Sequence, residues 1–402
     1  MVPFLKQVAQ YYYESGKAGG RCFIFPNRRS MVFFRKHLAQ AVKEDACHVP
    51  LAVPRMMTIN DFFYEVSGAA PADKVRLLLY LYRCYAELNK KAEPLDEFVF
   101  WGDVILGDFN DVDKYLADPK QLFANVADLK RLQDDYSYLT EAQRKAIEGF
   151  VSHFSDLSGK LTVDLDSDNP AVKERFLQIW NLMYPLYCRY NELLKENGLA
   201  YEGMVYRGVA DRLKTEAADD VFADSFPGGD VFVFVGLNTL NECEKRVLRK
   251  LKEASRAEFC WDYSGSMIQD PQNRSSLFMS ENIIEFPQVK RWDEEPVGVP
   301  AVNVVSVPSS VGQAKRLPDI LATVKDKGDC AIVLPDENLL VPVLNSIPDD
   351  VQDINVTMGL PMKGSLLYSL METVSAMQLH MAFRRNGWHF YHQQVWDLFS
   401  NP

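Results

Sequence analysis

The class of fold follows from residues 230–238, which run Asp-Val-Phe-Val-Phe-Val-Gly-Leu-Asn. The apolar part of this stretch, 231–235, is typical of a central strand in a parallel sheet, because helices cover such a strand on both faces. Shortly after it, Asn241 and Glu244 form a capping-box pattern that predicts the start of a helix. A further strand is expected at 257–261, so the order strand, helix, strand predicts an α/β fold.

The N-terminal region shows the same order. An amphipathic helix is expected first, and it is followed by a short apolar strand at 22–25. Arg28 then opens a second helix, whose apolar stripe is expected to contain Val32, Phe33 and Leu38. Strands from the two regions are therefore predicted to share one sheet.

A large helical block separates these two regions. From about residue 73 to residue 200, apolar side chains recur at helical spacing with few β-branched runs. Residues 264–300 are rich in Pro, Asn and Gln and are expected to be a connection. A second strand–helix module is expected after it, ending in a helix over 366–379. Its three strands are predicted at 302–307, 331–334 and 355–358.

Composition sets limits on size and location. The chain has 402 residues, 47% of them hydrophobic and 25% charged, so two or three domains are expected. No run approaches the roughly 18 apolar residues of a membrane span, and the N-terminus lacks a signal-peptide pattern, which favours a cytoplasmic protein. The net charge of -11 repels nucleic acid at long range, so any DNA site must be a local basic surface.

The cysteines favour free thiols in a reducing compartment, because they are far apart and include no C-x-x-C pair. Those inside apolar runs are expected to be buried: Cys22, Cys243, Cys260 and Cys330. Residues 164–168 imitate a calcium loop, but Pro170 and Arg175 stand where such a loop needs flexibility and a bidentate Glu. His389 and His392 have metal-like spacing without a third ligand. No metal and no cofactor is expected.

Strand–helix modules of this kind raise the expectation of a nucleotide-hydrolysing motor, but the motifs for hydrolysis are missing. A phosphate loop needs G-x-x-x-x-G-K-[ST] between a strand and a helix. The two Gly-Lys pairs, at 15–17 and 158–160, both lack the upstream glycine. The magnesium-binding acids expected at the end of strand 231–235 are replaced by Gly236 and Leu237. No catalytic residue is therefore assigned.

Two pairs of residues are candidates for contact with DNA. Arg28 and Arg29 open a helix directly after a strand, where guanidinium groups and free N–H donors can hold a phosphate. Gln313 and Lys315 stand at a similar helix start after the strand predicted at 302–307. The alternative for both pairs is an ordinary solvated helix start.

Several stretches together resemble the AddB-type subunits of bacterial AddAB helicase–nuclease complexes. The resemblance is closest to the Bacteroidetes form, an inactivated superfamily I helicase followed by a PD-(D/E)XK nuclease. It rests on residues 25–29 (Phe-Pro-Asn-Arg-Arg), Trp101-Gly102, residues 107–113 with Asp108, Asn110 and Asp113, residues 138–140 with Gln143, residues 201–204, residues 235–238 with Gly236, and residues 355–361 with Asn355, Thr357 and Gly359.

The resemblance implies two RecA-like, P-loop-NTPase-like modules with an all-α insertion in the first. The first module would comprise 1–65 and 206–300, the insertion 66–205, and the start of the second module 301–402. It also implies a role in DNA double-strand-break repair and recombination, with single-stranded or forked DNA and an AddA-type helicase–nuclease subunit as partners and no membrane. The nuclease domain is expected beyond Pro402.

Three functions are compatible with these observations. The leading hypothesis is an inactivated helicase region that binds and guides DNA without hydrolysing ATP. An active ATP-dependent DNA helicase with a divergent site would instead need Lys17 or Lys315. A helical protein-interaction scaffold would need no DNA contact at all.

Overall fold

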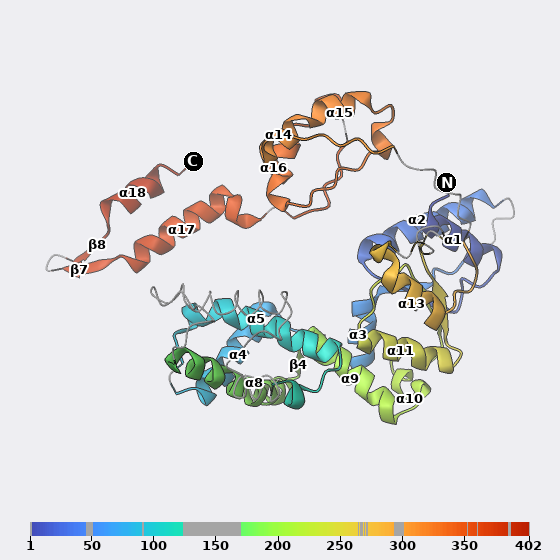
Figure 1. Cartoon of the computed structure of the whole chain (residues 1–402), viewed down its shortest axis with the longest axis horizontal. Coiled ribbons are helices and arrows are strands. Elements are labelled where there is room, and N and C mark those ends of the chain that lie inside the picture. Colours follow the sequence, from blue (N-terminus) through green and yellow to red (C-terminus); the bar gives the residue numbers. More distant parts are fainter. Residues whose placement is uncertain are drawn as a thin grey trace. The chain divides into compact units, whose positions relative to one another are not determined.

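The computed structural model describes residues 2–45, 51–90, 92–123, 170–263, 265, 268, 270, 272–292, 301–351, 353–359, 361–384 and 387–401, with only the backbone of 170–180 and of Asp329. The chain divides into two compact units, Met1–Gly298 and Val299–Pro402, and each is described by itself (Figure 1). The sequence patterns at 138–140, Gln143, 158–160 and 164–168 lie outside the described residues.

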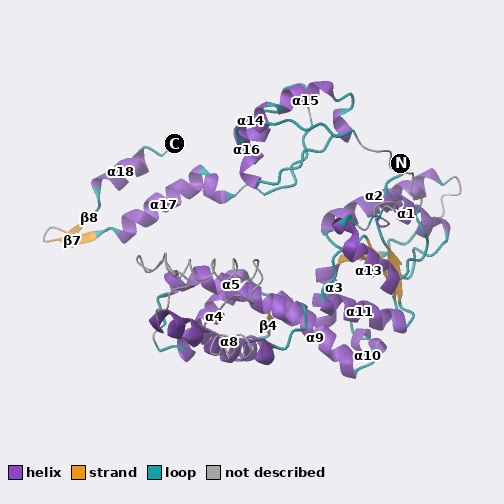
Figure 2. Cartoon of the chain, in the orientation of Figure 1, coloured by secondary structure: helices purple, strands orange, loops and turns teal. Residues whose placement is uncertain are grey.

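The first unit contains a parallel sheet of four strands in the order β2-β1-β5-β6. Its strands are drawn in orange among the helices of this unit (Figure 2). The strands are β1 (Arg21–Phe25), β2 (Arg55–Thr58), β5 (Val231–Val235) and β6 (Ala257–Cys260). In the central pair, Ile24 of β1 lies opposite Phe234 of β5. The predicted α/β class with a parallel sheet is confirmed, and β2 is an additional edge strand.

Helices cover both faces of this sheet. In β1, Phe23 and Phe25 pack against α1 and α2, whereas Cys22 and Ile24 pack against helices of the opposite face. The first face carries α1 (Phe4–Glu14) and α2 (Arg28–Glu44). The opposite face carries α3 (Ile59–Ser67), α9 (Glu202–Thr215), α10 (Ala218–Phe222), α11 (Glu242–Glu253) and α13 (Leu277–Glu285). Alternate side chains of the strands thus build two cores, which is why the buried parts of the central strands, 22–25 in β1 and 232–235 in β5, are apolar.

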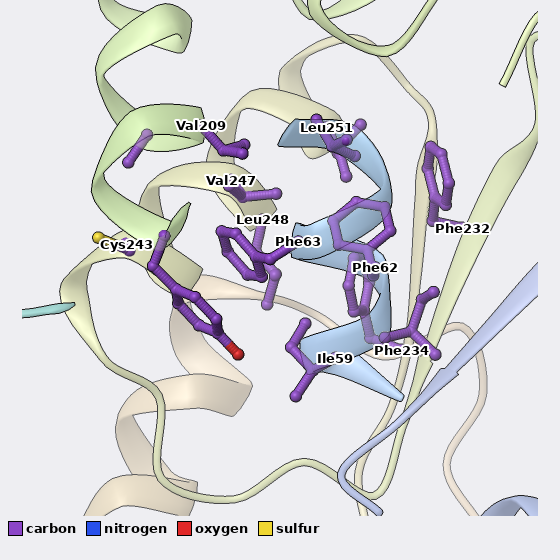
Figure 3. Packing of buried hydrophobic residues seen from close by; sticks show 14 of the residues in the cluster. Ile59, Phe62, Phe63, Val209, Phe232, Phe234, Cys243, Val247, Leu248 and Leu251 are labelled. Atoms are coloured by element: carbon purple, nitrogen blue, oxygen red, sulfur yellow. The ribbon is translucent and has the colours of Figure 1, made fainter. Parts of the chain in front are cut away.

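The core under α3 is rich in aromatic side chains (Figure 3). Phe62 is completely buried and lies 5.2 Å, between ring centroids, from Phe232 of β5. Phe63 stacks on Tyr206 of α9, with centroids 3.8 Å apart. A capping box starts α3, because Asp61 and Thr58 bond to each other's backbone N–H groups.

Two predictions for the first unit need correction. The apolar stripe of α2 consists of Phe34, Leu38 and Ala41, whereas Val32 and Phe33 are 50% and 44% exposed. The reason is that α2 packs on the sheet and on α1 through one narrow face. Consecutive residues of a helix point in different directions, so the apolar run 31–34 cannot lie entirely on that face. The region 264–300 contains α13 and the short 3-10 helix η1 (Arg274–Ser276) in addition to connecting segments.

The helical block lies between α3 and α9 in the sequence. The helices described in it are α4 (Lys74–Leu88), α5 (Leu95–Lys114) and α8 (Pro170–Glu196). They enclose a core of their own, in which Phe98, Phe109 and Tyr190 are fully buried. At its base, β3 (Ala70–Pro71) pairs with β4 (Leu199–Ala200), so the chain leaves and returns at one place.

The second unit is built mainly of helices. They are α14 (Ser310–Lys315), α15 (Leu317–Thr323), α16 (Leu340–Leu344), α17 (Leu366–Leu379), α18 (His392–Phe399) and the 3-10 helices η2 (Lys327–Asp329), η3 (Glu337–Leu339) and η4 (Met362–Gly364). One antiparallel hairpin joins β7 (Ala382–Arg384) to β8 (Gly387–His389). The prediction for α17 is confirmed.

The three strands predicted for the second unit are wrong. Residues 302–307, 331–334 and 355–358 form neither strand nor helix, and Val304 and Val333 are 90% and 82% exposed. A short apolar run becomes a strand only where neighbouring strands pair with its backbone, and these runs have none among the described residues. None of the described helices combines the length and the apolar character that a membrane crossing requires.

Candidate functional site

The order of the strands defines a switch point between β1 and β5. From β1 the chain passes through α2 to β2 at one edge of the sheet. From β5 it passes through α11 to β6 at the opposite edge. Because the two crossings run in opposite directions, α2 and α11 lie on opposite faces. Open α/β sheets bind ligands at the carboxyl ends of the strands where such connections part.

On the β1 side of the switch point, the connection consists of Pro26 and Asn27 alone. The side chain of Asn27 caps α2 by accepting a hydrogen bond of 2.9 Å from the backbone N–H of Ser30. Arg28 and Arg29 follow in the first turn, where the helix dipole favours an anion. Both side chains are exposed, and neither forms an ion pair with a described residue. This end of the sheet therefore offers two free guanidinium groups.

On the β5 side, a rigid turn follows the strand. Gly236 has φ +67, a left-handed conformation that favours glycine, and a Cβ there would lie 3.6 Å from the Phe4 ring. Its backbone N–H donates to the carbonyl of Cys260 at 2.9 Å, and the carbonyl of Asn238 accepts from Asn282 at 2.5 Å. Residues 236–238 carry no carboxylate.

Two carboxylates that follow these strands act as helix caps. Asp61 bonds Thr58 at the end of β2, and Glu244 accepts a 2.9 Å hydrogen bond from the backbone N–H of Asn241 after β5. Glu244 is only 8% exposed, and this burial raises its pKa to about 7. Both side chains are thus engaged within the fold.

A second polar cluster is buried where α5 meets α9 and α11. Its centre is Asp113, which is 1% exposed. The carboxylate accepts hydrogen bonds from the hydroxyl groups of Tyr187, at 2.5 Å, and Tyr201, and it pairs with Arg207 at 2.6 Å. The backbone carbonyl of Asp113 also accepts a 3.3 Å hydrogen bond from the thiol of Cys243.

The same junction joins two stretches that carry the family resemblance. The side chain of Asn110 accepts a 2.7 Å hydrogen bond from the backbone N–H of Gly203. A Cβ on Gly203 would lie 2.5 Å from the Asn110 carbonyl oxygen, so the two backbones are in close contact. Next to them, Lys114 pairs with Glu202 at 2.8 Å. Residues 107–113 and 201–204 therefore attach the helical block to the sheet.

The remaining predicted residues lie elsewhere. Trp101 is buried in the core of the helical block, 4.4 Å from Phe98 between ring centroids, and Asp108 is on the exposed side of α5. Gln313 and Lys315 are exposed on α14 in the second unit. The last three residues of the resemblance are exposed in a segment of the second unit that forms neither helix nor strand: Asn355, Thr357 and Gly359.

The cysteine prediction is correct for three of its four residues. Cys22, Cys243 and Cys260 are buried free thiols, and burial raises their pKa values. Cys330 is exposed, because the apolar run next to it forms no strand and enters no core. Within the described ranges, no three His, Cys, Asp or Glu side chains are grouped as metal ligands.

Sequence reasoning missed two groups of residues. Arg207 and Tyr187 complete the Asp113 cluster, but they are about 70 to 90 positions away and share no motif with it. Arg35, Lys36 and Lys43 add exposed positive charge to α2, and their helical spacing from Arg28 and Arg29 was a usable signal. Comparison with protein-family models and with curated proteins found no match.

Proposed function

We propose that this chain is the front part of a helicase–nuclease subunit that binds and guides DNA during double-strand-break repair, without hydrolysing ATP. In this proposal the sheet unit is a RecA-like module interrupted by the helical block, and the second unit opens another such module. An AddA-type partner in the cytoplasm would supply translocation. The resemblance of the stretches described above supports this assignment.

One structural observation carries the proposal. At the switch point, a motor of this architecture needs a glycine-rich phosphate loop and acids that hold magnesium. This chain has a connection of two residues after β1, which is too short to wrap a triphosphate, and Gly-Leu-Asn after β5. In the same place it exposes Arg28 and Arg29, whose charge suits the phosphate backbone of a nucleic acid.

The charge balance of the whole chain sharpens this expectation. With a net charge of -11, the protein repels DNA except where cations are concentrated. Arg28 and Arg29 provide such a place, because no described acidic residue is in ion-pair contact with them. Binding should therefore weaken steeply with salt, because released counterions supply much of its free energy.

Two measurements test the proposal. Single-stranded and forked oligonucleotides should bind the purified chain at low salt, and Arg28→Glu/Arg29→Glu should weaken that binding. Lys214→Glu/Lys250→Glu is a control with the same change of charge, since both residues have acidic partners, Asp211 and Glu253. No binding of either DNA would leave the protein-interaction scaffold as the better account.

The second measurement concerns ATP. Calorimetry should detect no magnesium-dependent ATP binding by the chain. Tight binding that is lost in Lys17→Ala or Lys315→Ala would instead favour an active helicase with a divergent site.

A further inference from the structure

The outer face of α2 carries an unusual concentration of positive charge. It has five cations, here called the basic stripe: Arg28, Arg29, Arg35, Lys36 and Lys43. All five are exposed, and none forms an ion pair with a described residue. Glu44, the one acid of α2, stands at its last position and accepts a 2.7 Å hydrogen bond from Gln40. In an acidic chain, this face is suited to a polyanion.

Helical geometry places three of these cations, Arg29, Lys36 and Lys43, in line. The steps from Arg29 to Phe33, Lys36, Gln40 and Lys43 alternate between four and three residues. This spacing keeps these five side chains on one side of the helix. The opposite side is the buried face with Phe34, Leu38 and Ala41. From Arg29 to Lys43 the rise along the helix is about 21 Å, at about 1.5 Å per residue.

An independent observation shows that positive charge also gathers at the edge of this face. His37 of α2 is half-buried, and its pKa is lowered by burial and by the ammonium groups of Lys6 and Lys36. Lys6 belongs to α1, so the positive field extends onto the neighbouring helix. No acid contributes to the lowered pKa of His37.

One exposed aromatic ring lies beside the basic stripe, on the same face of α2. Phe33 is 44% exposed between Arg29 and Lys36, whereas Phe34 beside it is fully buried. A phenyl ring flanked by cations fits a base and its adjoining phosphates, as in proteins that hold single-stranded nucleic acid. In a duplex the bases are stacked and paired and cannot reach such a ring.

We propose that the outer face of α2 is a binding track for single-stranded DNA, with phosphates on the basic stripe and one base stacked on Phe33. This inference rests on the proposed function and makes it specific. It extends the contact from the two arginines at the switch point along the whole helix. The track continues from the carboxyl end of β1 across the outside of the first layer of helices.

The electrostatic part is tested by salt dependence of binding to a labelled oligothymidylate, between about 50 and 200 mM salt. Arg29→Gln/Lys36→Gln/Lys43→Gln removes three phosphate contacts, so the slope of log affinity against log salt should become shallower by about 2. Lys74→Gln/Lys214→Gln/Lys250→Gln removes the same charge from residues paired with acids and should leave the slope unchanged. Equal slopes for the two triple variants would overturn the proposal.

The stacking part is tested at Phe33. Phe33→Leu should weaken binding of the oligothymidylate by about 5- to 150-fold, the equivalent of 1 to 3 kcal/mol per stacked base. Phe33→Tyr keeps an aromatic face and should bind like the unmodified chain. Heparin, a polyanion without bases, should not distinguish the two variants. Equal affinity of Leu and Tyr variants for the oligothymidylate would refute base stacking at this position.

The outcomes separate this inference from the proposed function. If Arg28→Glu/Arg29→Glu weakens binding of single-stranded DNA but Phe33→Leu and Lys36→Gln/Lys43→Gln do not, the contact is confined to the switch point and only the inference fails. If the unmodified chain binds no DNA at low salt, the proposed function fails as well. The substituted side chains are exposed, so circular dichroism should show an unchanged fold in every variant.

Discussion

Replacement of Asp113 by Ala tests whether the buried polar cluster holds the helical block to the sheet. The change removes the carboxylate that pairs with Arg207 and accepts hydrogen bonds from Tyr187 and Tyr201. Loss of one partner from a buried ion pair costs about 3 to 5 kcal/mol, because the other charge stays buried without compensation. Since Arg207 is 20% exposed and can recruit some water, the lower half of this range is expected.

A matched control is available on the same helix. Asp103 of α5 pairs with Lys74 at 2.8 Å, but both side chains are largely exposed. Exposed pairs contribute about 0 to 1 kcal/mol, so Asp103→Ala should have little effect. The double variant Asp113→Leu/Arg207→Leu should regain part of the lost stability, because it leaves no buried charge unpaired.

Urea unfolding of the whole chain, followed by circular dichroism, measures these effects. A loss of about 3 kcal/mol lowers the midpoint by at least about 1 M for a slope of 1 to 3 kcal/mol per M. Amide hydrogen exchange should show the loss of protection in α5 and α9 first, because these helices meet at the cluster. If Asp113→Ala and Asp103→Ala unfold at the same urea concentration, the cluster does not hold the junction.

Three further predictions concern stability. Gly203→Ala should destabilise the chain by at least about 1 kcal/mol in urea unfolding, because the new Cβ would meet the Asn110 carbonyl oxygen at 2.5 Å. Gly208→Ala on the same helix is the control. Its Cβ meets nothing within 4 Å, so it should stabilise the chain by about 0.5 to 1 kcal/mol. For Glu244, the folded pKa of about 7 exceeds the ordinary value of 4.5, so the folded state binds the proton more tightly. The free energy of unfolding should therefore fall by roughly 3 kcal/mol as pH rises from about 4.5 to about 7, and Glu244→Gln should lack this component; parallel pH profiles of both proteins would contradict it. Phe62→Ala should cost about 3 to 5 kcal/mol in thermal or urea unfolding, since the ring is fully buried among other aromatic rings, and a loss below about 1 kcal/mol would show that the core refills the space.

The sheet could be predicted from the sequence where a strand carries its own signal. β1 and β5 contain apolar runs bounded by turn residues, β6 is apolar apart from Glu258, and each was expected. β2 was missed because Arg55-Met56-Met57-Thr58 is neither apolar throughout nor alternating. It is an edge strand with one neighbour, so its sequence is constrained less.

The second unit shows the limit of such signals. Residues 302–307 are rich in valine, as β5 is, yet they form no strand. The difference is that β5 pairs with β1 and β6 on its two sides. These partners come from other parts of the chain, so the sequence of a segment alone cannot predict whether it will have them.

The candidate site divides in the same way. The helix start at Arg28 and the capping pair of Asn241 and Glu244 are local, and the sequence predicted both. The Asp113 cluster depends on a contact between α5 and α9 that only the tertiary structure creates. The DNA role of Arg28 and Arg29 stays a prediction for the binding experiments.

The pairing of β3 with β4 has an evolutionary consequence. Because Ala70 lies opposite Leu199 and Pro71 opposite Ala200, the two ends of the helical block are adjacent. A segment whose ends meet can be acquired or deleted in a single genetic event while the order of the parent sheet is preserved. The block can thus be lengthened, shortened or removed without a change in the order of the four sheet strands.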